Sequence, residues 1–190
     1  MIADTLIRAA TLLTTLGLAA GASGEQFRLT SGDFTPGGTL NDEQAFDGMG
    51  CTGKNVSPAL RWSGAPAGTK SFALLLHDPD APTGGAGWWH WIAYDIPANV
   101  TELRKGAGKA DGSAMPAGAK SVANDYGTPG YGGPCPPVGD KAHRYVFTLY
   151  ALKVDKLELP QGAHAPVVGF VVNANTIAKA SVTGMYGRAR

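Results

Sequence analysis

The fold is decided by residues 71–97, which read SFALLLHDPDAPTGGAGWWHWIAYDIP. Both ends of this stretch, Ser71–His77 and Trp89–Ile96, are rich in aromatic, leucine and β-branched residues, a composition typical of strands. Between them, Thr83–Gly87 contains too much glycine for regular structure. We therefore predict two strands joined by a turn-rich loop.

Three further runs have the same strand-like composition: Phe27–Thr30, Ala59–Trp62 and Arg144–Leu152. One helix is predicted from about Pro166 to Lys179, because proline suits a first helical turn. Its apolar residues recur at helical spacing, at Val167, Phe170, Val171, Ala174 and Ile177. The strand-like runs lie too close together for repeated βαβ units, so we predict a mainly β, antiparallel fold with a few peripheral helices.

The composition fits a single turn-rich domain. The chain has 190 residues, of which 27 are glycine and 13 proline, well above the roughly 12% that these two usually supply together. Sixteen basic and 15 acidic side chains give a net charge of +1. This balance provides no broad electrostatic basis for binding nucleic acid or an anionic membrane surface.

The N-terminus has the pattern of a signal peptide over residues 1–22. Arg8 precedes an apolar run, Ala9–Ala20, and the small residues Ala20-Gly21-Ala22 then resemble a cleavage site. The run is shorter than the roughly 20 residues that span a bilayer, so no integral membrane span is predicted. We expect a periplasmic or secreted protein with one domain over residues 23–190; the alternative is an N-terminal amphipathic helix.

Export changes how the two cysteines are interpreted. In an oxidising compartment Cys51 and Cys135 are candidates for a disulfide bond. Neither lies in a CxxC motif, which disfavours a zinc site or a thioredoxin-like site. The alternative is two free thiols, one of them lining a pocket. No metal and no cofactor is expected.

The common catalytic and nucleotide-binding motifs are absent from the sequence: it contains no GxSxG, P-loop, HExxH or EF-hand loop. Residues Gly48–Gly53 fit GxGxxG, but the dinucleotide fingerprint requires a helix to open directly after it. Here Lys54–Pro58 follows and cannot open a helix. No nucleotide site is predicted.

Polar residues gather at the ends of three strand-like runs: Asp78–Pro82, Trp88–Trp91, and the segment from Pro134 to Tyr145. Each cluster alone could be structural, since Asp and Pro form turns and a histidine on a buried face is often a core residue. Together they suggest a small polar pocket in an apolar sheet.

Strand alternation predicts which of these side chains share a face. One face of the second strand would carry His90, Ile92, Tyr94 and Ile96, and its other face Trp89, Trp91 and Ala93. In the last predicted strand, one face would carry His143, Tyr145, Phe147 and Leu149. The His143 imidazole and Tyr145 phenol would then be neighbours above an apolar wall.

The ordered blocks Asp78–Pro82, Trp89-His90, Gly133–Pro137 and His143–Tyr145 resemble the phosphatidylethanolamine-binding proteins, also called Raf kinase inhibitor proteins. The segments 55–62 and 67–71 look like the bacterial branch of that family, and the signal peptide and cysteines resemble its exported members. The resemblance runs from about Phe27 to Tyr186.

The resemblance implies a Greek-key β-sandwich with short flanking helices and a pocket for phosphate-like anions. By position, Asp78, His90, His143 and Tyr145 match the family's pocket residues. Pro137 and one tryptophan of the pair Trp88 and Trp89 match its wall. Trp89 stands where eukaryotic members carry the first histidine of a His-His pair, a departure that argues against kinase inhibition here.

Imidazole and phenol groups suit a phosphate-like ligand because they donate hydrogen bonds to its oxygens. Backbone N–H groups of the glycine loops 84–87 and 130–133 are expected to add donors. Asp78 would repel a dianion unless it orients a histidine N–H or meets a protonated oxygen, and the orienting role is the one we predict. Affinity for the anion should then rise as the pH falls through ~6–7.

We therefore expect a non-enzymatic binding protein for a phosphorylated or otherwise anionic small molecule of the head-group type. One alternative is a metal-assisted hydrolase that uses His90, His143, Asp78 and Asp80, all of which are correct ligand types. The other is a secreted interaction module that engages an unknown protein partner through surface loops. Exposed apolar β surface and the family resemblance also suggest a homodimer.

Overall fold

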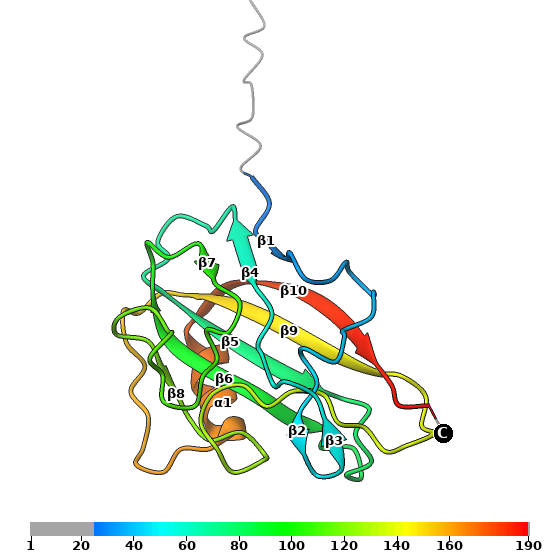
Figure 1. Ribbon diagram of the computed structural model, residues 1–190. Helices are drawn as coiled ribbons and strands as arrows, with labels where there is room; N and C mark the ends of the chain where they lie inside the picture. The colour runs from blue at the N-terminus through cyan, green and yellow to red at the C-terminus, as the bar shows by residue number, and fades with distance from the viewer. Residues whose placement is uncertain (1–24, 190) are drawn as a thin grey trace, which may run out of the picture.

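The structure, a computed structural model, describes residues 25–189, so the predicted signal peptide at 1–22 lies outside the described residues. Its centre is a five-stranded antiparallel sheet in the order β10-β9-β5-β6-β8 (Figure 1). The strands are β5 (Ser71–Asp78), β6 (Trp88–Pro97), β8 (Lys120–Ser121), β9 (His143–Leu152) and β10 (Thr176–Tyr186). Strand β9 returns beside β5 after β6 and β8, which is the Greek-key order.

A second sheet covers one face of the first, with β1 (Arg28–Ser31), β4 (Leu60–Ser63) and β7 (Glu102–Leu103). The main core lies between the two sheets and includes Trp62, Trp91 and Phe147. Helix α1 (Ala165–Asn175) covers the opposite face of the larger sheet (Figure 1). The prediction of a mainly β, antiparallel sandwich is confirmed.

A β-bulge at His90 changes the faces predicted for β6. One extra residue interrupts the pairing with β5 at this point, so His90 lies against Tyr145 on the side of the main core, where Trp91 and Ala93 also lie. Trp89 packs instead in the cluster beneath the helix. The predicted grouping of Trp89 with Trp91 and Ala93 is therefore wrong, because a bulge breaks strict alternation.

A second irregularity in β6 lies at Asp95, whose backbone has a positive φ of 56°. Beyond it Ile96 points into the main core, whereas Ile92 and Tyr94 face the helix. The predicted common face for His90, Ile92, Tyr94 and Ile96 is thus also wrong. Strand β9 pairs without a register shift from His143 to Ala151, and its alternating burial over this stretch agrees with the predicted face.

Helix α1 ends earlier than predicted. It stops at Asn175, and Thr176 begins β10, which pairs with β9. The predicted helical face is also wrong: Ala165, Val168 and Val172 are buried, whereas Phe170 is 76% exposed. Asparagine and β-branched residues favour helices weakly, so strand pairing determines the conformation of residues 176–179.

Several elements carried too little signal to be predicted. Strand β10 was missed, as were the two-residue strands β7, β8, β2 (Asp47–Gly48) and β3 (Cys51–Thr52). The β2–β3 pair overlaps Gly48–Gly53, the segment that fits GxGxxG, and no helix opens after it. Between residues 25 and 189, no helix reaches the length and apolarity that a membrane span requires.

Candidate functional site

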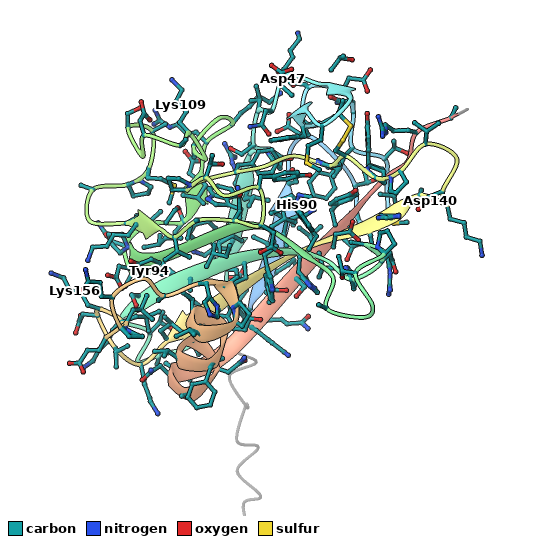
Figure 2. The ribbon with its side chains drawn as sticks, turned by 90° about the horizontal axis from the view of Figure 1, so that it is seen from below. Asp47, His90, Tyr94, Lys109, Asp140 and Lys156 are labelled. Carbon is teal, nitrogen blue, oxygen red and sulfur yellow. A yellow bond between two sulfur atoms is a disulfide. The ribbon has the colours of Figure 1, made fainter. Side chains whose placement is uncertain are left out.

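A cavity of about 190 Å³ opens where β5 ends and where β6 and β9 begin. These strand ends meet because β5 pairs antiparallel with both neighbours, which places Asp78 opposite Trp88 and His77 opposite Val146. Thirteen residues line the cavity: Met49, Asp78, Ala81, Pro82, Thr83, Trp88, His90, Tyr126, Cys135, Pro136, Pro137, His143 and Tyr145. His90 lies near the middle of the molecule in Figure 2.

Six of the seven predicted site residues lie around this cavity: Asp78, Trp88, His90, Pro137, His143 and Tyr145. Trp89 does not line it. The Trp89 ring lies over His77, with ring centroids 4.2 Å apart, on the side of the sheet that faces the helix. The bulge at His90 explains this placement, since Trp88 and His90 reach the cavity while Trp89 points away.

Asp78 and His143 form a buried pair, with 3% and 4% of their surfaces exposed. Nδ1 of His143 donates a hydrogen bond to Oδ2 of Asp78 at 2.7 Å. The other carboxylate oxygen, Oδ1, accepts the backbone N–H of Asp80 at 2.8 Å. This geometry matches the orienting role predicted for Asp78.

His90 makes a different kind of contact. Its Nδ1 donates to the carbonyl oxygen of Gly132 at 2.7 Å. Because a carbonyl only accepts, Nδ1 carries the proton, and Nε2 of the neutral ring is an acceptor. Burial lowers the pKa of His90 to about 4, so the neutral ring prevails at physiological pH.

Three buried polar atoms around the cavity have no hydrogen-bond partner among residues 25–189: His90 Nε2, Trp88 Nε1 and Tyr145 Oη. Burial also raises the pKa of the Tyr145 phenol far above its usual value, so this group keeps its proton. Buried polar groups are normally paired. Their concentration at one cavity therefore indicates a place for a polar ligand or for ordered water.

Tyr126 is a lining residue that the sequence interpretation missed. Its ring stacks on Phe46 with centroids 3.9 Å apart, and its hydroxyl donates to the carbonyl of Gly133. It comes from a loop between β8 and β9 with no strand or motif beside it, so nothing in the sequence singled it out. Met49, which is 72% exposed at the rim, was also missed, because its segment Gly48–Gly53 was considered only as a nucleotide site.

The glycine loops do not supply the backbone donors that were expected. In the loop 130–133, the N–H of Gly132 donates to the His90 carbonyl and that of Gly133 to Asn55 Oδ1. The N–H of Tyr131 donates to Gly108. Residues 84–87 do not line the cavity. These N–H groups hold the loop in place rather than face a ligand.

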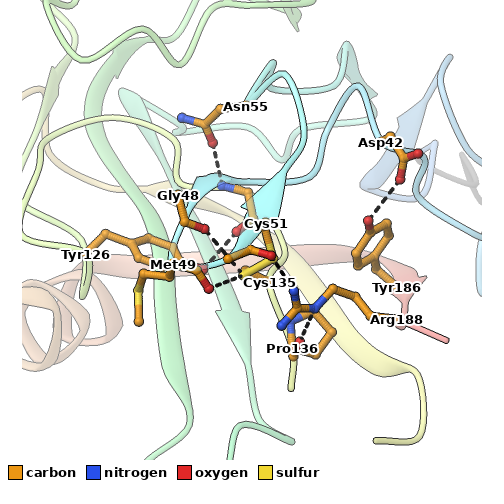
Figure 3. The surroundings of a disulfide bond; sticks show 12 residues. Asp42, Gly48, Met49, Cys51, Asn55, Tyr126, Cys135, Pro136, Tyr186 and Arg188 are labelled. Atoms are coloured by element: carbon orange, nitrogen blue, oxygen red, sulfur yellow. Dashed lines mark hydrogen bonds between the residues drawn. A yellow bond between two sulfur atoms is a disulfide. The ribbon is translucent and has the colours of Figure 1, made fainter. Parts of the chain in front are cut away.

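The predicted disulfide between Cys51 and Cys135 is present and fastens the β2–β3 hairpin to the proline wall. Arg188 adds a second connection, since it donates to the carbonyls of Gly50 and Pro136 at 2.7 Å each (Figure 3). The rim formed by Met49 and Pro136 is thus braced from two sides.

Asp80, the second carboxylate of the first cluster, does not line the cavity. It accepts two side-chain hydrogen bonds from Arg144 at 2.6 and 2.9 Å and one from the Arg144 backbone at 2.9 Å. The side-chain hydrogen bonds from Arg144 lower the pKa of Asp80 to about 2. Its role is to fix the start of β9 against the turn after β5.

The charges around the cavity are unusual for an anion site, because no lysine or arginine belongs to its lining. The acidic side chain in the lining is Asp78. Over residues 25–189, no group of three or more His, Cys, Asp or Glu side chains is placed to hold a metal ion. The remaining lining is mostly aromatic rings and proline.

Comparison with known proteins gives consistent matches. The chain is 48% identical over 165 residues to the UPF0098 protein YbcL of Escherichia coli, covering 87% of this chain and 90% of that protein. The crystal structure of YbcL, described as a new member of the mammalian PEBP family, superposes with a TM-score of 0.82 at 48% identity, covering 86% of this chain and 99% of that one.

A putative phosphatidylethanolamine-binding protein homologue from Chlamydia trachomatis superposes with a TM-score of 0.71 at 32% identity, covering 85% of this chain and 97% of that one. The putative lipoprotein LppC of Mycobacterium tuberculosis is 48% identical over 113 residues, 60% of this chain and 51% of that protein. The family model for phosphatidylethanolamine-binding protein matches residues 30–187. The chain therefore belongs to the phosphatidylethanolamine-binding protein family.

Proposed function

We propose that this chain is a non-enzymatic binding protein whose cavity holds one phosphate-like group of a small molecule. The observation that carries the proposal is the convergence of Asp78, His90, His143 and Tyr145 on one cavity with three unpartnered buried polar atoms. A tetrahedral phosphate group would satisfy these atoms together, since its oxygens accept from Trp88 Nε1 and Tyr145 Oη and a P–O–H on it donates to His90 Nε2.

The size and rim of the cavity support a head group rather than a whole lipid. A volume of about 190 Å³ is below the roughly 300 Å³ at which pockets for drug-sized ligands begin. The rim is apolar: Met49 is 72% exposed, Val138 beside the proline wall is 55% exposed, and Pro136 also lines the cavity. The remainder of the ligand would lie across this surface.

We also propose that the protein is exported, with residues 1–22 as its signal peptide and residues 23–190 as the single mature domain. The disulfide supports this location, because such bonds persist in oxidising compartments. The relative LppC is itself described as a putative lipoprotein. A homodimer and a protein partner stay predictions that the cavity does not address.

The metal-assisted hydrolase is the weaker alternative. It needs Asp80 as a ligand, but Asp80 is held by Arg144 outside the cavity. It also needs Asp78, whose two carboxylate oxygens already accept hydrogen bonds from Nδ1 of His143 and from the backbone N–H of Asp80. Two of the four proposed ligands are thus committed to other contacts.

Calorimetric titration of the mature chain with inorganic phosphate tests the proposal. We expect saturable 1:1 binding that weakens at least tenfold in Tyr145→Phe, because the variant lacks one charge-assisted hydrogen bond. Trp89→Phe is the matched control, since it lies on the same sheet but outside the cavity. Absence of saturable binding, or equal weakening by both variants, would contradict the proposal.

A further inference from the structure

The hydrogen-bonding direction of His90 limits what the cavity is able to bind. Nδ1 is committed as a donor to the Gly132 carbonyl at 2.7 Å, and Nε2 is buried without a partner. In the neutral imidazole this leaves a lone pair at Nε2, which needs a donor from the ligand. Fully ionised oxyanions have no such donor.

The surroundings of His90 oppose a second proton on the ring. The edges of Tyr126 and Tyr145 pack against it, with ring centroids 5.6 and 5.1 Å away, and the residue is 2% exposed. The charged groups facing it are the carboxylates of Asp78 and Asp125, which favour protonation only weakly against this burial. His143 of β9 lines the same cavity but pairs with Asp78.

The rest of the cavity also disfavours a doubly charged ligand. No lysine or arginine lines it, and Arg144 and Arg188 are engaged with Asp80 and with backbone carbonyls. The Asp78 carboxylate is itself part of the lining. The two unpartnered donors, Trp88 Nε1 and Tyr145 Oη, are neutral and suit a single negative charge.

We infer that the cavity binds its phosphate-like group as a singly charged anion that keeps a proton, with a P–O–H donating to His90 Nε2. The ligands are then inorganic phosphate, phosphate monoesters and phosphonates, in preference to phosphodiesters and sulfate. This inference rests on the proposed function and adds the selectivity of the cavity among phosphate-like ligands. Ordinary phospholipid head groups are phosphodiesters and would be disfavoured, whereas a lipid or a soluble compound that ends in a phosphate monoester would be accepted.

The pKa values agree with this assignment. His90 would take up a proton only near pH 4, whereas a phosphate monoester takes one up near pH ~6. At neutral pH the proton therefore resides on the ligand oxygen at much lower cost than on the ring. Phosphodiesters and sulfate hold no proton at this pH, so they would leave Nε2 unpaired in the cavity.

The experiment compares four probes with the mature wild-type chain at pH 7 by calorimetry: inorganic phosphate, methyl phosphate, dimethyl phosphate and sulfate. We expect methyl phosphate and inorganic phosphate to bind at least tenfold more tightly than dimethyl phosphate and sulfate. If all four bind equally, the inference is wrong while the proposed function stands. If none binds, the proposed function itself is wrong.

The pH dependence identifies which partner carries the proton. Above the ionisation of the ligand, affinity for methyl phosphate should fall about tenfold per pH unit, and sulfate should show no such fall. With methylphosphonate, which ionises at a higher pH, the midpoint of the profile should move with the ligand. A midpoint that stays fixed for both ligands would assign the proton to a protein histidine and overturn the inference.

A variant provides a second readout. In His90→Asn, the shorter amide keeps a donor for the Gly132 carbonyl but removes the acceptor at Nε2. Selectivity for methyl over dimethyl phosphate should drop to less than threefold, while Trp89→Phe retains it. Undiminished selectivity in a folded His90→Asn would overturn the inference, and the wild-type pH profiles decide the matter if that variant fails to fold.

Discussion

Two strands bring a histidine to the same cavity, and they do so by different means. On β9, His143 lies in regular alternation with Tyr145 and pairs with the Asp78 carboxylate at 2.7 Å. On β6, His90 is the extra residue of a bulge and pairs with the carbonyl of Gly132 at 2.7 Å. One imidazole is held by a charge and the other by a neutral dipole.

This difference gives the two rings different chemistry. A carboxylate at Nδ1 is able to stabilise an imidazolium, whereas a carbonyl in an apolar environment favours the neutral ring. His143 therefore belongs to a buried ionisable pair, and His90 presents a lone pair. Substitutions on the His90 side and on the His143 side of the cavity should therefore have separable effects on stability.

The largest expected effect comes from removing the disulfide, which supports the His90 side through the loop that contains Gly132. The bond closes 84 residues, so the double variant Cys51→Ala/Cys135→Ala should lose about 4 kcal/mol of unfolding free energy on the loop-entropy model. Urea unfolding at pH 7 measures it. Wild type in reductant should show a similar loss, and a change below about 1 kcal/mol would contradict this account.

The pH dependence of stability should reveal the neutral His90. Because burial lowers its folded pKa to about 4 from 6.5, the unfolded chain binds the proton first as the pH falls. The contribution of the neutral His90 to the free energy of unfolding is therefore fully present above pH 6.5. It is lost as the pH falls towards 4, by roughly 3 kcal/mol. Parallel stability curves for wild type and His90→Asn between pH 7 and 4 would show this assignment to be wrong.

Removing the Asp78 carboxylate, on the His143 side of the cavity, should lower the free energy of unfolding somewhat less. Asp78→Ala leaves Nδ1 of His143 and the N–H of Asp80 without their acceptor, and we expect a loss of about 2 to 3 kcal/mol in urea unfolding.

Asp80→Ala is the matched control, because it removes a carboxylate two residues away that lies outside the cavity and pairs with the exposed side chain of Arg144. It should cost less than about 1 kcal/mol. Equal losses in Asp78→Ala and Asp80→Ala would mean that the Asp78–His143 pair contributes no more than a surface ion pair.

The same contrast between β9 and β6 explains how much the sequence could predict. Alternation placed His143 and Tyr145 correctly because β9 pairs without a register shift from His143 to Ala151. It misplaced Trp89 because a bulge is a property of two paired strands and leaves no signal in one of them. Five cavity residues were still identified because they lie at strand ends that composition revealed: Asp78, Trp88, His90, His143 and Tyr145.

What the sequence could not predict depends on long-range packing. Tyr126 reaches the cavity only because its ring stacks on Phe46, which is distant in the chain. Helix α1 stops at Asn175 because residues from Thr176 onward pair with β9. Neither this aromatic stacking nor the competition between helix and strand can be read from local propensity or periodicity.

The central claim is tested most directly by the indole N–H signals of Trp88 and Trp89 in ¹⁵N-edited NMR spectra during titration with inorganic phosphate. These neighbours lie on opposite sides of the sheet, and only Trp88 has an unpartnered Nε1 at the cavity. We predict a saturable downfield shift for Trp88 and almost none for Trp89. No saturable change at Trp88, or an equal response from both indoles, would contradict the assignment of this cavity as the binding site.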